Sequence, residues 1–144
     1  MPEVAFHFNA PDKLQYTCRL LRKAVGSGAT VTVLGSAALI NALDQLLWSF
    51  SNVDFLPHCE GSAPANVAKR TPIVLLSSLD TVDKGDLLVN LGTTVPQEMD
   101  RFVRIVEIVG SEPDDKQHAR QRWKHYLDLG IGLIRHDLGQ RAAI

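Results

Sequence analysis

The chain has 144 residues, of which 45% are hydrophobic and 22% charged, a composition that suits one globular domain and a length too short for two. Its net charge of −1 provides no overall attraction to nucleic acid or to an anionic membrane. Two cysteines make no disulfide framework, and the sequence has neither a signal-peptide pattern nor an apolar run near the roughly 20 residues of a membrane span. We therefore expect one cytoplasmic domain over residues 1–144.

The first 50 residues alternate between strand and helix patterns. Residues 3–8 and 30–34 have the apolar alternation and the β-branched composition of strands. Pro11 is suited to begin a helix that ends near Gly26, and Gly35 turns the chain into a second helix with a wide apolar stripe. This order predicts an α/β fold whose first two strands form a parallel pair with a right-handed crossover.

The following segments alternate less regularly. A short strand is expected within residues 51–57, and residues 57–72 contain three prolines and no apolar period, so we expect a flexible loop there. Apolar runs then predict strands at residues 73–76, 86–91 and 102–109, a helical turn at 95–100 and an edge strand at 131–134. Residues after 135 are expected to be loose.

Residues 111–130 carry start and stop signals of a helix. Ser111 can cap the N-terminus, Asp114 completes a capping-box pattern, and Pro113 fits the first turn because its missing N–H costs nothing there. Gly130 tolerates the left-handed conformation that often ends a helix.

One face of this helix combines positive charge with an aromatic ring. Lys116, Arg120 and Lys124 are spaced four apart, and Trp123 lies three residues from Arg120. From Lys116 to the end of the sequence there are six lysines and arginines but only two aspartates, which gives this segment a net charge of +4. The pattern fits a ligand that is acidic and aromatic, but also a solvated helix face whose tryptophan anchors the core.

Motifs for nucleotide binding, metal binding or catalysis are weak or missing in this sequence. The turn at Leu34, Gly35 and Ser36 follows a strand and opens a helix, as a nucleotide-binding loop would, but it has one glycine where the dinucleotide fingerprint has three. His58 and Cys59 have no further ligands at zinc-site spacing, so we expect no metal and no cofactor. Without a catalytic triad or a carboxylate pair, we expect no enzyme activity.

The chain resembles the chi subunit family of bacterial DNA polymerase III. The resemblance rests on the strand–helix–strand–helix start, LDQLLW at residues 43–48, FLPH at 55–58 and ARQRWKHY at 119–126 followed by Gly130. It implies a single three-layer, Rossmann-like α/β domain with a mixed, largely parallel sheet. It also implies a non-catalytic accessory subunit of the clamp-loader assembly, with no membrane binding and no direct specific binding of nucleic acid.

The resemblance implies two protein partners. The first is the acidic C-terminal tail of single-stranded-DNA-binding protein, which ends in Pro-Phe; the family's tail-binding positions map onto Lys116, Arg120, Trp123 and Lys124, with Val109 as an apolar neighbour. Trp123 stands where the family usually has tyrosine. The second partner is the psi subunit, which would link the chain to the clamp loader through Trp48, Phe55, Leu56 and Pro57. For Phe55 and Leu56, a place in the core is the alternative.

Overall fold

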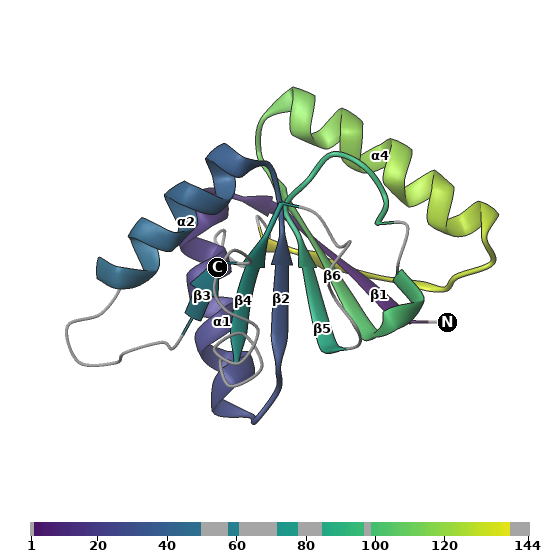
Figure 1. Ribbon diagram of the computed structural model, residues 1–144. Coiled ribbons are helices and arrows are strands. Elements are labelled where there is room, and N and C mark those ends of the chain that lie inside the picture. Colours follow the sequence, from purple (N-terminus) through teal and green to yellow (C-terminus); the bar gives the residue numbers. More distant parts are fainter. Residues whose placement is uncertain (1, 50–57, 61–71, 78–84, 97–98, 139–144) are drawn as a thin grey trace.

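We describe residues 2–49, 58–60, 72–77, 85–96 and 99–138 of a computed structural model of the chain. The helices are α1 (Lys13–Gly26), α2 (Ala37–Ser49), α4 (Pro113–Asp128) and the short 3-10 helix η1 (Met99–Arg101). The strands are β1 (Glu3–Ala10), β2 (Val31–Leu34), β3 (His58–Glu60), β4 (Ile73–Leu76), β5 (Gly85–Asn90), β6 (Phe102–Gly110) and β7 (Leu133–Asp137). Figure 1 shows α1 and α2 close together and α4 apart from them.

The seven strands form one sheet in the order β3-β4-β2-β5-β6-β1-β7. Every pairing between described strands is parallel. The predicted Rossmann-like α/β fold with a largely parallel sheet is therefore confirmed. The antiparallel pairing that a mixed sheet requires does not occur among the described strands.

The predicted direct pairing of the first two strands is wrong. β1 and β2 run parallel in the same sheet, but β5 and β6 lie between them. β1 pairs instead with β6, with Val4 opposite Ile105, and on its other side with β7. β6 is nine residues long and buried from Ile105 to its end, so it belongs in the middle of the sheet.

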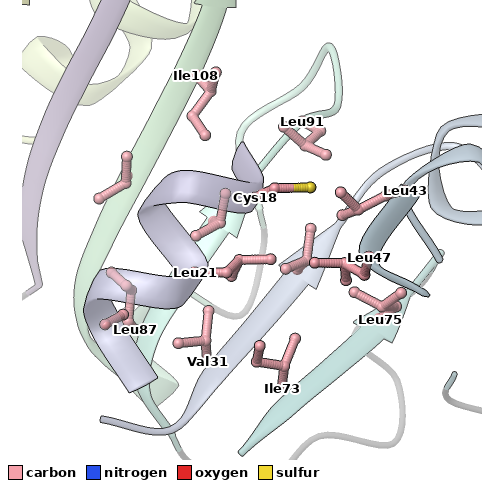
Figure 2. Packing of buried hydrophobic residues seen from close by; sticks show 14 of the residues in the cluster. Cys18, Leu21, Val31, Leu43, Leu47, Ile73, Leu75, Leu87, Leu91 and Ile108 are labelled. Atoms are coloured by element: carbon pink, nitrogen blue, oxygen red, sulfur yellow. The ribbon is translucent and has the colours of Figure 1, made fainter. Parts of the chain in front are cut away.

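Helices cover the sheet on both faces. On one face, α1 buries Thr17, Cys18, Leu21 and Ala24, and α2 buries Ile40, Leu43 and Leu47. Figure 2 shows Cys18 and Leu21 of α1 beside Leu43 and Leu47 of α2 over the strands. On the other face, α4 packs over a second cluster that includes Phe6, Ile105 and Val109. These layers confirm the predicted three-layer arrangement.

Two helix starts differ from the prediction. Pro11 precedes α1, and Asp12 is the N-cap, with its side chain accepting from the Gln15 backbone N–H at 3.1 Å. Ser111 does not cap α4: Glu112 occupies the N-cap position without a side-chain cap bond, and Pro113 opens the helix.

Several predicted segments are also revised. β3 occupies residues 58–60 of the expected loop 57–72, where it adds an edge strand beside β4. β7 runs to Asp137, so the expected loose segment does not begin at residue 136, because pairing with β1 continues that far. Residues 50–57, which hold the expected short strand, and residues 61–71 and 139–144 lie outside the described residues.

Candidate functional site

A pocket of about 420 Å³ lies on the face of the sheet that α4 covers. Its lining comes from β1, β6, α4 and β7: Phe6, Phe8, Asn9, Val109, Lys116, Ala119, Arg120, Trp123 and Arg135. Four of the five predicted tail-binding residues are in this set. The fifth, Lys124, is exposed on α4 and does not line the pocket, although it lies four residues from Arg120.

The pocket has an aromatic floor. Phe6 and Phe8 lie two apart on β1 and therefore face the same side of the sheet. The Phe6 ring lies 5.0 Å from the Trp123 ring, centre to centre, at an interplanar angle of 65°, an edge-to-face contact. Phe6 is buried, whereas Trp123 is half-buried and presents the rest of its ring to the pocket.

Three cations surround this floor. Lys116 and Arg120 come from one face of α4, and Arg135 comes from β7 across the pocket. The guanidinium carbon of Arg135 lies 5.1 Å from the centre of the Phe8 ring and 5.9 Å from that of Trp123. These are cation–π distances. Among the described residues that line the pocket, none is acidic.

The C-terminal end of β1, which contributes Asn9 to the pocket lining, has an irregular backbone. The β1–β6 register shifts between His7 and Ala10, and Asn9 adopts a left-handed backbone with φ of 61°, which asparagine tolerates better than most residues. The Asn9 amide donates to Asp137 at 2.9 Å, which ties the end of β1 to the end of β7.

This arrangement suits a chain end that is both apolar and anionic. An aromatic side chain can pack on Phe6, Phe8 and Trp123, while arginine can hold a carboxylate through two parallel hydrogen bonds. Sequence reasoning missed Phe6, Phe8, Asn9 and Arg135. The alternation in residues 3–8 signals Phe6 and Phe8 as core residues, but nothing in the sequence places β1 beside α4.

A buried polar cluster lies under α4. Glu107 of β6 is fully buried and accepts from Arg122 Nε at 2.9 Å, from the Tyr126 hydroxyl at 2.6 Å and from the Asn90 amide at 3.0 Å. Burial raises the pKa of the Glu107 carboxyl, and the Arg122 charge opposes this effect. Arg122, which sequence reasoning counted with the basic helix residues, is 2% exposed.

The turn at Leu34, Gly35 and Ser36 has a structural explanation. A Cβ on Gly35 would lie 3.3 Å from the Leu91 Cβ, so glycine allows the turn before α2 to pack closely against the segment after β5. Ser36 caps α2, its hydroxyl accepting from the Leu39 backbone N–H at 3.2 Å.

The position where a Rossmann-like fold would hold a nucleotide is unfavourable for phosphate. Such ligands bind where adjacent strands send their helices to opposite faces, here between β1 and β6. The hollow there is lined by Glu112, Asp114 and Asp115, and Lys13 is already paired with Asp115 at 3.2 Å. These carboxylates would repel a phosphate, which disfavours the nucleotide-binding alternative at this edge.

The predicted psi-facing residues are described only in part. Trp48 lies one residue before the end of α2 and is 60% exposed. Phe55, Leu56 and Pro57 lie outside the described residues. Within the described ranges, no helix is long and apolar enough to cross a membrane, and no three His, Cys, Asp or Glu side chains are grouped as a metal site.

Comparisons with known proteins agree on one family. The model of the family described as DNA polymerase III chi subunit, HolC, matches residues 1–133. A protein of Pseudomonas aeruginosa named DNA polymerase III subunit chi is 33% identical over 127 residues, covering 88% of this chain and 87% of the relative. A protein of the same name from Haemophilus influenzae is 25% identical over 126 residues, covering 87% of each chain. Another from Escherichia coli is 32% identical over 97 residues, covering 63% of this chain and 61% of the relative.

Proposed function

The chain belongs to the DNA polymerase III chi subunit family, and from this premise we propose that it is a non-catalytic adaptor in the cytoplasm. It binds the acidic C-terminal tail of single-stranded-DNA-binding protein and links that protein to the clamp-loader assembly of the replisome through psi. The observation that carries the proposal is the pocket under α4, where three cations and no described carboxylate surround an aromatic floor.

The chemistry of the tail matches each part of the pocket. A terminal phenylalanine would pack its ring against Phe6, Phe8 and Trp123. Its carboxylate would meet Arg120, Lys116 or Arg135, since a charged acceptor forms the strongest hydrogen bonds with such donors. The preceding acidic residues would lie along the exposed basic face of α4, where Lys124 adds long-range attraction.

Calorimetric titration tests this function. The ligand is the last ten residues of the host's own single-stranded-DNA-binding protein, and the matched control is the same peptide without its final phenylalanine. We expect micromolar affinity, about −8 kcal/mol, for the first peptide and none for the second, because the ring and the terminal carboxylate are placed together. Equal binding, or no binding of either peptide, would contradict the proposal.

The link to psi rests on the exposed Trp48 at the end of α2, on the layer opposite α4. Exposed tryptophan is a frequent anchor of protein interfaces. Co-purification with the host's psi should be lost in Trp48→Ala but retained in Arg120→Ala. Loss of psi binding in Arg120→Ala as well would argue against two separate surfaces.

A further inference from the structure

Helix α4, which carries most of the charged wall of the pocket, has an unusual inner face. Its buried residues are Ala119, Arg122 and Tyr126, and none of them is leucine, isoleucine or valine. By contrast, α2 is held by Ile40, Leu43 and Leu47. Since large aliphatic side chains normally supply the burial energy that docks a helix, α4 depends more than α2 on other contacts.

Those contacts converge on one carboxylate. Arg122 and Tyr126 are four apart on α4, so they face the sheet together, and both donate to Glu107: Arg122 Nε to one oxygen at 2.9 Å and the Tyr126 hydroxyl to the other at 2.6 Å. Two bonds from successive turns to one fixed point on β6 determine both the rotation of α4 about its axis and its position along the strand.

The carboxylate is itself held from the other side. The Asn90 amide, on β5, donates to both oxygens of Glu107, at 3.1 and 3.0 Å, and to the carbonyl of Thr94 at 3.0 Å. The side-chain Oδ1 of Asn90 accepts from the Gly92 backbone N–H at 2.9 Å. The segment after β5, strand β6 and helix α4 are thus joined through Glu107.

The aromatic contacts connect this cluster to the pocket. Phe6 makes edge-to-face contacts with Trp123 at 5.0 Å and with Tyr126 at 5.9 Å between ring centres. The Phe6 ring therefore connects Trp123, which lines the pocket, to Tyr126, which donates to Glu107. A shift of Tyr126 would therefore move Phe6 and Trp123, and a rotation of α4 would also move Lys116 and Arg120.

We propose that Glu107 is a positioning residue, which through Arg122 and Tyr126 fixes α4 at the rotation that closes the peptide pocket. It touches no ligand, since it is fully buried and does not line the pocket. The inference deepens the proposed function and rests on it for the link to peptide affinity. The hydrogen bonds from Arg122 and Tyr126 to Glu107 are sufficient by themselves to support its role in fixing α4.

The ion pair limits which variants are informative. The two Nη atoms of Arg122 have no hydrogen-bond partner among the described residues, and Arg122 is 2% exposed. Removing the charge of Glu107 would strand a buried cation, so Glu107→Gln can fail to fold for that reason alone. Tyr126→Phe removes a single hydroxyl and keeps both the ion pair and the ring, and it is the principal variant.

The test compares Tyr126→Phe with a control that is destabilised elsewhere. Leu43→Val lies in the cluster under α1 and α2, across the sheet from α4. For each protein, hydrogen exchange of the α4 and α1 amides is followed by mass spectrometry, and the affinity for the acidic decapeptide ending in Pro-Phe is measured well below the unfolding temperature. Glu107→Gln is added where circular dichroism shows that it folds.

In Tyr126→Phe, we expect the α4 amides to exchange about tenfold faster relative to α1, and peptide affinity to fall by about the same factor, because a hydrogen bond to a charged acceptor is lost. Leu43→Val should leave the exchange of the α4 amides and the peptide affinity unchanged, because it loosens the cluster that holds α1 and α2. Unchanged exchange of α4 in Tyr126→Phe would overturn the positioning role, as would faster exchange with unchanged affinity. If the unsubstituted protein bound no peptide, the proposed function and the link to affinity would both fail, while the exchange result would still decide whether Glu107 fixes α4.

Discussion

The guanidinium carbon of Arg135 on β7 lies 5.9 Å from the centre of the Trp123 ring on α4. The two residues belong to the edge strand β7 and to the helix before it, so the edge of the sheet contributes a cation to the pocket beside the basic helix. The same guanidinium lies 5.1 Å from Phe8. Arg135 therefore adds a cation to the pocket and also covers part of its aromatic floor.

Arg135→Ala should weaken binding of the tail peptide by about 1 kcal/mol, since it removes one exposed cation that can pair with the carboxylates of the peptide. Titration calorimetry against the same decapeptide measures the change. Arg104→Ala is the matched control, because Arg104 is exposed on β6 and does not line the pocket. Equal losses in the two variants would mean that Arg135 contributes only its long-range charge.

Arg120→Ala should cost more, about 1.5–3 kcal/mol of peptide binding, the range for a hydrogen bond to a charged group. Lys124 tests whether position or charge is responsible, because it lies on the same helix but outside the pocket. We expect Lys124→Ala to lose less than 1 kcal/mol, and the loss to vanish at about 1 M salt, where exposed charges are screened. An unchanged affinity in Arg120→Ala would count against the site.

The sequence grouped the charged and aromatic helix residues that line this pocket, but of its strand residues it identified only Val109. Lys116, Arg120 and Trp123 lie on one helix, so their spacing alone brings them together. Arg135 and Phe8 come from β7 and β1, which are neighbours only because the sheet order places β1 between β6 and β7. Such long-range pairing leaves no local pattern in the chain.

Arg122 was counted with the other basic residues of α4, although its side chain is buried. It lies among several charged residues in ARQRWKHY, and a basic residue in such a stretch usually faces solvent. Its partner is Glu107, 15 positions earlier on β6, in the buried half of that strand. A single acidic residue in FVRIVEIV was the available signal, but it does not identify its partner.

Cys18 should resist alkylation in the folded protein. Burial, with a smaller contribution from the Asp12 charge, raises the pKa of its thiol from 9.0 to about 11, so at pH 8.5 almost no reactive thiolate is present. In a Cys59→Ser background, we expect iodoacetamide to modify Cys18 only slowly at pH 8.5 and rapidly in denaturant. Fast modification without denaturant would contradict the buried position.

The same shift gives a pH dependence of stability. The folded-state pKa of Cys18 is above the unfolded one, so the folded protein holds the proton more tightly. The contribution of the thiol to the free energy of unfolding is therefore complete below pH 9 and is lost as the pH rises from about 9 to 11. Urea unfolding of the unsubstituted protein and of Cys18→Ala at pH 8 and pH 10.5 isolates this effect. An equal fall in the free energy of unfolding of both proteins would assign the pH dependence to other groups.

Asp115 and Asp114 provide a matched pair at the start of α4. Both lie in the first turn, where the helix dipole favours an acidic residue. Asp115 also accepts from the Gly110 N–H at 2.6 Å and pairs with Lys13 at 3.2 Å, which joins α4 to α1 and to the end of β6, whereas Asp114 is exposed.

Asp115→Ala should therefore lower the free energy of unfolding by about 1–2 kcal/mol, the value of a partly buried charged hydrogen bond. Asp114→Ala should lower it by less than about 0.5 kcal/mol. Urea unfolding curves give both numbers, and a loss in Asp114→Ala as large as that in Asp115→Ala would mean that the dipole, and not the link between the helices, is what Asp115 supplies.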